Sequence, residues 1–335
     1  MRADTVTKDF ISDANVFSDV FNYYIYGGQQ VIRPEQLTPQ DSVKIALPYG
    51  EVGKTVPIQR FRDAQKLYTA MTDGEVEYVL YGIESQEEIH YAMPVKNNLY
   101  DALDYVVQVE KTGKAHREAM KREREEREAG ETEENVSLKK PNSGEFLGGF
   151  WKEDKLMPSV TVTIYFGSDQ WDGPLNLFEM IEVEDPKLFS FMDNYQVRLI
   201  APALMTDEEI MKFQTNLREV LLFIKYSKDK EKLRDILIMN EKRFREVERG
   251  AADVIKVITN SGLKYDEKEL KIDVCQAIKE MREESQKEGE DIGVLKKAQE
   301  DARNFYRLGV KLEIIAEGVG YDLGTVKTWL GLSVE

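Results

Sequence analysis

The stretch that decides the fold spans residues 63–86 and reads DAQKLYTAMTDGEVEYVLYGIESQ. It predicts a β-rich run that follows a turn at Thr72-Asp73-Gly74 and ends near the acid Glu84. Successive side chains of a strand point to opposite faces and rise about 3.3 Å per residue, so Glu84 and Gln86 share one face, roughly 7 Å apart. The apolar residues of the run take the other face: Val79, Tyr81 and Ile83.

A carboxylate at the end of an apolar strand needs a partner, because burying an unpaired charge is costly. One such partner is a divalent cation held by Asp63 and Glu84, with the carbonyl oxygen of Ser85 as a third ligand. A cation in this position polarises a phosphodiester oxygen and lowers the pKa of a bound water. Gln86 has no useful pKa near neutrality, but its amide can orient the water or a phosphate oxygen.

The same residues have a plainer interpretation, because Asp…Glu-x-Gln is a short and permissive pattern. In this interpretation Asp63 begins or caps a helix, Glu84 pairs with a lysine, and Gln86 belongs to a turn. The spacing of these three residues does not choose between a metal site and ordinary structural roles.

The formal charge of −16 at pH 7 argues against a chain that coats DNA by bulk attraction, because neutralising phosphates requires Lys and Arg. A local basic rim can still coexist with acidic helices. Arg60, Arg62 and Lys66 form such a cluster beside Asp63 and are candidate DNA-contacting residues. Ordinary solvated surface charge is the alternative for the same three residues.

Composition indicates a cytoplasmic protein of two or three domains. The chain has 335 residues, of which 41% are hydrophobic. No run approaches the roughly 18 apolar residues that span a bilayer, and the N-terminus lacks an apolar signal region, so we expect no membrane partner. With Cys275 as the one cysteine and His90 and His116 as the two histidines, a Cys/His zinc site is excluded. Carboxylates are then the abundant ligands, and they favour a hard cation such as magnesium.

Apolar periodicity and helix signals predict the N-terminal part of the fold. A stripe at helical spacing predicts the first helix, and Gly27-Gly28 ends it. The stripe consists of Phe17, Val20, Phe21 and Tyr24. Met93-Pro94 predicts a break in the chain, after which Asn97 or Asn98 caps a second helix.

Further along, alternating β-formers predict strands over 160–166 and 196–200. The Lys-, Arg- and Glu-rich stretch before them predicts a protruding helix or a solvated insertion at about 111–148, with order returning at Leu156. Helical spacing dominates after the second strand, so a mixed α/β domain precedes a helical one. The predicted domains are 1–205, 206–285 and 286–335.

The tail predicts two short helices around Gly320, with an apolar set that includes Ala316, Val326 and Trp329. Ala316 and Gly320 stand where a helix-turn-helix needs close packing and a sharp bend. The second helix offers only Lys327 as a base, whereas a groove-reading helix needs several donors. We therefore favour assembly of copies of the chain over DNA reading for this tail.

Segments from most of the chain, though not from the charged insertion, share a pattern with a known family. They are Asn15–Asn22, Gly28–Ile32, Arg62–Lys66, Tyr81–Gln86, Tyr91–Pro94, Tyr100–Ala102, Pro158–Gly167, Trp171–Pro174 and the Trp329-Leu330 ending. Together they resemble the Rpn family of recombination-promoting nucleases, also called YhgA-like transposases, within the PD-(D/E)xK nuclease superfamily.

The resemblance implies an α/β fold, with a PD-(D/E)xK restriction-endonuclease-like core in which helices flank a mixed β-sheet, followed by a C-terminal helical region. It implies that Asp63 and Glu84 are the metal-binding acids and that the catalytic set includes Gln86. Gln86 stands where many relatives have lysine, and Arg62 stands where they have proline. Asp19, from the first helix, is the implied accessory acid.

The activity implied by the resemblance is metal-dependent hydrolysis of phosphodiester bonds in DNA, associated with recombination or mobile elements. DNA is the implied partner, and magnesium is the implied cofactor, with calcium or manganese as alternatives. We also expect a homo-oligomer. Two other classes stay open: a DNA-binding or regulatory protein with weak or no catalysis, and a helical interaction protein with no role on nucleic acid.

Overall fold

The computed structural model describes residues 3–40, 43–46, 58–72, 75–129, 140–266 and 268–332. The predicted turn residues Asp73 and Gly74 lie outside these ranges. The chain forms two compact units, Met1–Ser261 with Leu270–Ile272, and Gly262–Glu269 with Asp273–Glu335. This division differs from a boundary at residue 205, because the helices between residues 207 and 259 belong to the first unit.

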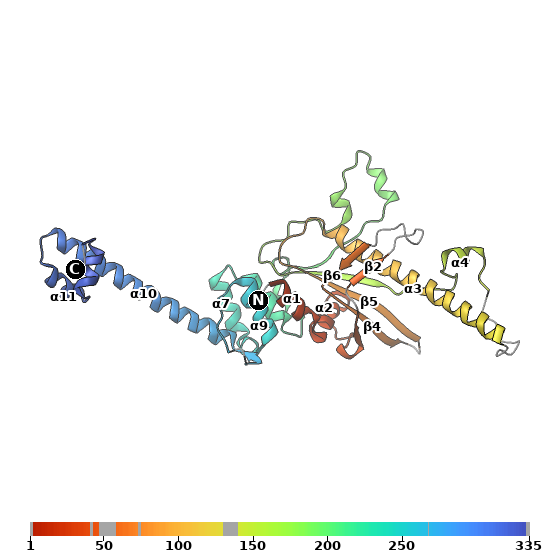
Figure 1. Cartoon of the computed structure of the whole chain (residues 1–335), viewed down its shortest axis with the longest axis horizontal. Helices are drawn as coiled ribbons and strands as arrows, with labels where there is room; N and C mark the ends of the chain where they lie inside the picture. The colour runs from red at the N-terminus through yellow and green to blue at the C-terminus, as the bar shows by residue number, and fades with distance from the viewer. Residues whose placement is uncertain are drawn as a thin grey trace. The chain divides into compact units, whose positions relative to one another are not determined.

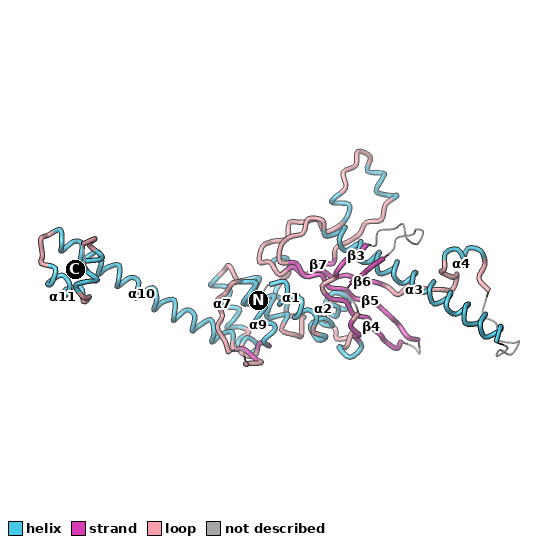
Figure 2. Tube along the Cα trace, in the orientation of Figure 1, coloured by secondary structure: helices cyan, strands magenta, loops and turns pink. Residues whose placement is uncertain are grey.

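The first unit is built on a five-stranded mixed sheet in the order β1-β4-β5-β6-β7 (Figures 1 and 2). Its strands are β1 (Leu37–Pro39), β4 (Ala64–Thr72), β5 (Glu75–Gln86), β6 (Ser159–Tyr165) and β7 (Arg198–Ile200). β4 and β5 are antiparallel, whereas β6 runs parallel to both β5 and β7. The predicted α/β fold with a mixed sheet and flanking helices is therefore confirmed, whereas the PD-(D/E)xK assignment stays a prediction.

Two N-terminal helices pack against one face of the sheet. They are α1 (Ala3–Ser12) and α2 (Ala14–Tyr26). Asp13 caps α2 by accepting hydrogen bonds from two backbone N–H groups of its first turn, and Gly27 ends α2 with a φ of 63°. Phe17 and Phe21 are fully buried, and the Phe21 ring stacks on Tyr81 of β5 with 4.2 Å between ring centroids. The helix predicted from this apolar stripe and its glycine stop is confirmed.

The helix α3 (Met93–Ala129) lies against the opposite face and begins earlier than predicted. Pro94 does not break the chain, because a proline in the first turn of a helix lacks only an N–H that has no intrahelical partner there. Asn97 is not a cap. Its buried side chain instead donates a hydrogen bond to the hydroxyl of Thr163 on β6, at 2.8 Å.

A ladder of polar side chains joins α3 to β6. Beyond Asn97, the carboxylate of Asp101 accepts from the hydroxyl of Thr161, and that of Asp104 accepts from the hydroxyl of Ser159 at 2.7 Å. The partner positions on α3 rise while those on β6 fall, so the helix runs antiparallel to the strand. This face of α3 is buried although it is polar, because its groups find partners on the sheet.

Arg62 completes this ladder from the segment just before β4. Its guanidinium lies 3.0 Å from the Asp104 carboxylate and 3.4 Å from the Asp101 carboxylate, and the Arg62 side chain is 1% exposed. The arginine crosses β5 at Gly82, where an added Cβ would clash with the guanidinium nitrogen Nη1. Glycine is therefore required at residue 82 for Arg62 to reach its two acids.

Residues 111–129 of the charged stretch form the distal part of α3, in agreement with the predicted protruding helix, and residues 130–139 lie outside the described part of the chain (Figure 1). The returning chain packs against this helix through the short α4 (Ser143–Gly148) and the residues after it. The His116 ring stacks on Trp151 at 3.8 Å, and its Nε2 lies 2.9 Å from the Asp154 carboxylate. Residues 142–154 are therefore folded against α3, whereas the sequence predicts that ordered structure begins at Leu156.

Shorter elements complete the first unit among the described residues. The helices are α5 (Asp207–Ile210), α6 (Leu217–Tyr226), α7 (Lys230–Met239), α8 (Glu241–Phe244) and α9 (Arg249–Thr259). The short 3-10 helices are η1 (Pro34–Gln36), η2 (Leu177–Met180), η3 (Pro186–Phe191) and η4 (Pro202–Leu204). The remaining antiparallel strand pairs are β2 (Val43–Ala46) with β3 (Ile58–Phe61), and β8 (Val247–Glu248) with β9 (Lys271–Ile272).

The second unit consists of a long helix and a small helical end. Its helices are α10 (Val274–Arg307), α11 (Leu312–Val319) and α12 (Leu323–Trp329). Gly320 turns the chain between the last two with a φ of 76°, and Ala302, Ile315 and Val326 form the core of the end. The predicted pair of short helices around Gly320 is confirmed, whereas the predicted boundary at residue 285 falls inside α10. Within the described ranges, no helix combines the length and apolar character that a membrane span requires.

Candidate functional site

The sheet brings Asp63 and Glu84 together. Asp63 precedes Ala64 of β4, and Ala64 is the register partner of Ile83 on β5, so Asp63 falls opposite Glu84. The carboxylate of Asp63 accepts hydrogen bonds from the backbone N–H of Ser85 at 2.8 Å and from its hydroxyl at 3.1 Å. The strand period therefore places both acids at the same end of neighbouring strands.

Glu84 is a buried carboxylate with one oxygen in use. Its side chain is 1% exposed, and its Oε2 lies 2.9 Å from the ammonium of Lys96 on α3. Its Oε1 is buried and has no hydrogen-bond partner among the described residues. Burial raises the pKa of Glu84 to about 7, and the negative charge of Asp63 raises that pKa further while Lys96 lowers it. Pairing with a lysine agrees with the plainer interpretation of the sequence.

Two lysines that the sequence did not predict as site residues face the two acids. Lys96 contacts Glu84, and the ammonium of Lys8 on α1 lies 3.2 Å from the Asp63 carboxylate and 3.0 Å from that of Asp4. Neither lysine belongs to the strand motif, because each reaches the site from a helix packed at the end of the sheet. The one local sign is Pro94, which is favoured in the first turn of a helix and so indicates that α3 begins early enough to include Lys96.

Ser85 and Gln86 lie at the end of β5 as predicted, but the amide of Gln86 is used in a hydrogen bond to Ser85. The Gln86 amide nitrogen donates to the Ser85 carbonyl oxygen at 2.6 Å. That carbonyl is the predicted third ligand, and it keeps a second lone pair for another partner. Gln86 therefore holds the strand end and brings no charge to the site.

The predicted basic rim is wrong for Arg62 and Lys66. Arg62 is buried in the ladder beneath α3. Lys66 is also buried, with its ammonium 5.4 Å from the centroid of the Phe17 ring, and burial lowers its pKa. Helices cover both faces of β4, so alternate residues are hidden from solvent in both directions. The backbone of Arg60 lies in β3, and its side chain lies outside the described part of the chain.

Asp19 is buried away from the two acids. Its carboxylate accepts hydrogen bonds from the backbone N–H groups of Gln214 and Thr215 at 2.9 and 2.8 Å, and from the Thr215 hydroxyl at 2.7 Å. It belongs to α2, which packs on the Tyr81 face of β5, whereas Glu84 is on the α3 face. Asp19 thus ties α2 to the segment before α6, and the structure does not bring it into the site.

The donors at the strand end fit a magnesium ion with few protein ligands. Glu84 Oε1 is an orphaned buried acceptor, and the side chain of Asp63 is 13% exposed, so the pair is open toward solvent on the Asp63 side. Among the described residues, no group of three or more His, Cys, Asp or Glu side chains is arranged to hold a metal. Magnesium commonly takes one or two carboxylates and completes its shell with water and substrate phosphates.

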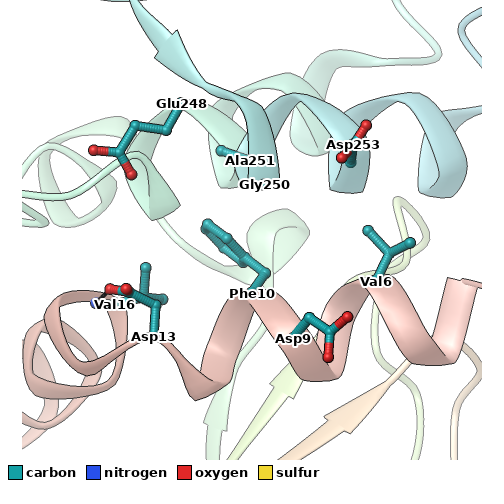
Figure 3. Close-up of a pocket in the computed structure, with 9 residues that line it drawn as sticks. All are labelled: Val6, Asp9, Phe10, Asp13, Val16, Glu248, Gly250, Ala251 and Asp253. Carbon is teal, nitrogen blue, oxygen red and sulfur yellow. Dashed lines mark hydrogen bonds between the residues drawn. The ribbon is translucent and has the colours of Figure 1, made fainter. Parts of the chain in front are cut away.

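A pocket of about 280 Å³ lies between α1 and α9 in the first unit, and it contains none of the predicted site residues (Figure 3). Phe10 and Val6 point into it from α1. Its acids are Asp9, Asp13, Glu248 and Asp253. Asp13 caps α2 and Asp253 lies 3.6 Å from Arg249, so these carboxylates have structural partners of their own.

Comparison with known proteins found no matching family model, no matching curated protein and no matching solved structure. The function of the chain is therefore inferred from the contacts that Asp63 and Glu84 make.

The burial of Glu84 predicts an unusual pH dependence of stability in the absence of divalent cations. The Glu84 pKa is about 7 in the folded chain and near 4.5 when unfolded, so between these values the folded state holds a proton that the unfolded state lacks. The free energy of unfolding should fall by about 1–3 kcal/mol from pH 5 to pH 8 through this residue.

Urea unfolding in EDTA at several pH values measures this slope. Glu84→Gln removes the titration, so its slope should be flatter than that of the original chain. Equal slopes in the two proteins would show that Glu84 titrates normally.

Proposed function

We propose that this chain is a metal-dependent endodeoxyribonuclease that hydrolyses phosphodiester bonds in DNA. The observation that supports this most is the buried Glu84, which stands opposite Asp63 at the end of β5 and whose Oε1 has no hydrogen-bond partner among the described residues. Burying a carboxylate with an unsatisfied oxygen costs free energy of folding, unless a cation or a hydrogen-bond donor contacts that oxygen while the protein functions.

Asp63 and Glu84 would hold the cation, with the Ser85 carbonyl as the further candidate ligand. Magnesium fits these oxygen donors, with manganese or calcium as alternatives. A cation bound there would polarise a phosphate oxygen and lower the pKa of a bound water. Ser85 keeps the Asp63 carboxylate in place through its N–H and hydroxyl, and Gln86 fixes the Ser85 carbonyl.

The reaction is the attack of water on phosphorus. The water oxygen forms a bond to phosphorus, the bond from phosphorus to one bridging oxygen breaks, and the departing alkoxide takes up a proton while the attacking water loses one to solvent. The chain's contribution is to place the phosphate and the water, and to stabilise the added negative charge.

One observation favours the second candidate, a DNA-binding or regulatory protein without catalysis. Both acids already carry a lysine partner, Lys8 on Asp63 and Lys96 on Glu84. Two such ion pairs stabilise the strand end without a metal ion. In a protein without catalysis, Asp63 and Glu84 would therefore have a purely structural role.

Incubation of the purified chain with supercoiled plasmid separates the two candidates. We expect conversion to nicked and linear DNA with magnesium or manganese and none with EDTA. Equal survival of supercoiled DNA under all conditions contradicts the nuclease. A gel-shift series at increasing salt then distinguishes a DNA-binding protein, whose affinity falls steeply with salt, from one with no role on nucleic acid.

A further inference from the structure

Lys96 uses only one of the two oxygens of Glu84. Its ammonium lies 2.9 Å from Oε2, whereas Oε1 is left without a partner among the described residues. Glu84 can therefore bind a cation through Oε1 and keep Lys96 on Oε2 at the same time. The Lys96 side chain is 27% exposed, so it is partly accessible to solvent, whereas Glu84 is buried.

The position of Lys96 is fixed by its neighbours on α3. Asn97 donates to Thr163, and Thr163 is the register partner of Glu84 in the β5–β6 pairing. Met93 is fully buried one turn earlier, and the ammonium of Lys96 lies 6.0 Å from the centroid of the Tyr100 ring one turn later. The first turn of α3 is thus anchored on both sides of Lys96, which brings its ammonium to Glu84 before any ligand binds.

The strand itself brings no positive charge to the site. Gln86 is neutral, and its amide is engaged by the Ser85 carbonyl. Arg62 lies on the same face, but its guanidinium is engaged by Asp101 and Asp104 and is buried. Lys8 pairs with Asp63, at 3.2 Å. Among the described residues, Lys96 is the cation in contact with the buried acid.

Building on the nuclease function proposed above, we propose that Lys96 is a catalytic residue that contacts a non-bridging oxygen of the scissile phosphate. A cation on Glu84 Oε1 would hold a phosphate at the same carboxylate whose Oε2 contacts the ammonium of Lys96, within reach of that ammonium. Negative charge on the non-bridging oxygens grows as water attacks phosphorus, and a fixed ammonium in a partly buried site stabilises that charge. Lys96 keeps its proton throughout, so the proton balance of the hydrolysis is unchanged.

The test compares nicking by the full chain with that of Lys96→Met and of Lys114→Met. Lys114 is the matched control, because it lies on the same helix and its side chain is 74% exposed in a pair with Glu118. We expect Lys96→Met to lower magnesium-dependent nicking about 100-fold. The magnesium-induced rise in thermal midpoint should persist in this variant, and Lys114→Met should behave as the original chain.

A second variant moves the charge back onto the strand. Gln86→Lys in the Lys96→Met background places an ammonium on the same face as Glu84, and nicking should recover at least about tenfold from the level of Lys96→Met. Nicking by Lys96→Met within threefold of the original chain overturns the proposal, as does a double variant no faster than Lys96→Met. A loss of nicking together with loss of the magnesium response also overturns it, because Lys96 then only supports the fold of the site. Absence of any magnesium-dependent nicking in the original chain contradicts the nuclease function itself, which is a separate result.

Discussion

Glu84→Gln should lower magnesium-dependent nicking of plasmid DNA at least about 100-fold, which corresponds to about 3 kcal/mol of lost transition-state stabilisation. Glutamine keeps the shape of the side chain but removes its negative charge, so the cation loses its buried ligand. The fold should survive, because the change removes a charge from the interior, and Lys96 is left in a partly exposed position.

Glu88→Gln is the control for this experiment. Glu88 follows the same strand end but is exposed, so its neutralisation should leave nicking within about twofold. The magnesium-induced rise in thermal midpoint should be lost in Glu84→Gln and kept in Glu88→Gln, since only a ligand that binds the folded state stabilises it. Nicking by Glu84→Gln at the original rate would remove Glu84 from the catalytic set, whatever its burial.

The pairing of Asp63 with Glu84 illustrates what the sequence could predict. The period of two along a strand and the β-rich run after the 72–74 turn place Glu84 at a strand end, and the first helix is predicted by its apolar stripe. These are local rules, and they depend on residues that are neighbours in the sequence. The strand order of the five-stranded sheet agrees with these local rules at the end of β5 where Glu84 lies.

The failures concern residues whose surroundings come from distant parts of the chain. Arg62 and Lys66 look like surface charges in the sequence, yet α2 and α3 cover the two faces of β4 and bury both. Asn97 has the character of a helix cap, yet its partner is Thr163 on a strand far along the chain. Lys96 was missed for the same reason, because no local rule says which strand the start of a helix will meet.

Apart from Lys66, which is buried beneath α2, these failures share a physical cause in the polar interior between α3 and the sheet. A buried face normally reads as a stripe of apolar residues, but α3 presents amides and carboxylates that find partners on β6 and on Arg62. The spacing of apolar residues in the sequence therefore cannot distinguish this buried polar face of α3 from a face exposed to solvent. The interior ladder also sets where Lys96 meets Glu84, so the site depends on residues that make no contact with it.

Arg62→Met should destabilise the first unit by about 3–5 kcal/mol. The substitution removes the guanidinium that lies 3.4 Å from the buried carboxylate of Asp101 and 3.0 Å from that of Asp104, and with it the attraction to both charges. Methionine retains much of the volume of the arginine stem, so lost packing contributes little. Urea unfolding followed by circular dichroism measures the change.

Arg234→Met is the matched control for the arginine. Arg234 pairs with Asp235 at 3.5 Å, but both side chains are more than half exposed, so its loss should change the free energy of unfolding by less than about 1 kcal/mol. A triple variant with Arg62→Met, Asp101→Asn and Asp104→Asn should regain part of the stability lost in Arg62→Met, because the two buried negative charges are removed along with the arginine. If Arg62→Met unfolds at the same urea concentration as the original chain, the buried ladder is not what holds α3 on β6. Lys96 would then need another explanation for its place beside Glu84.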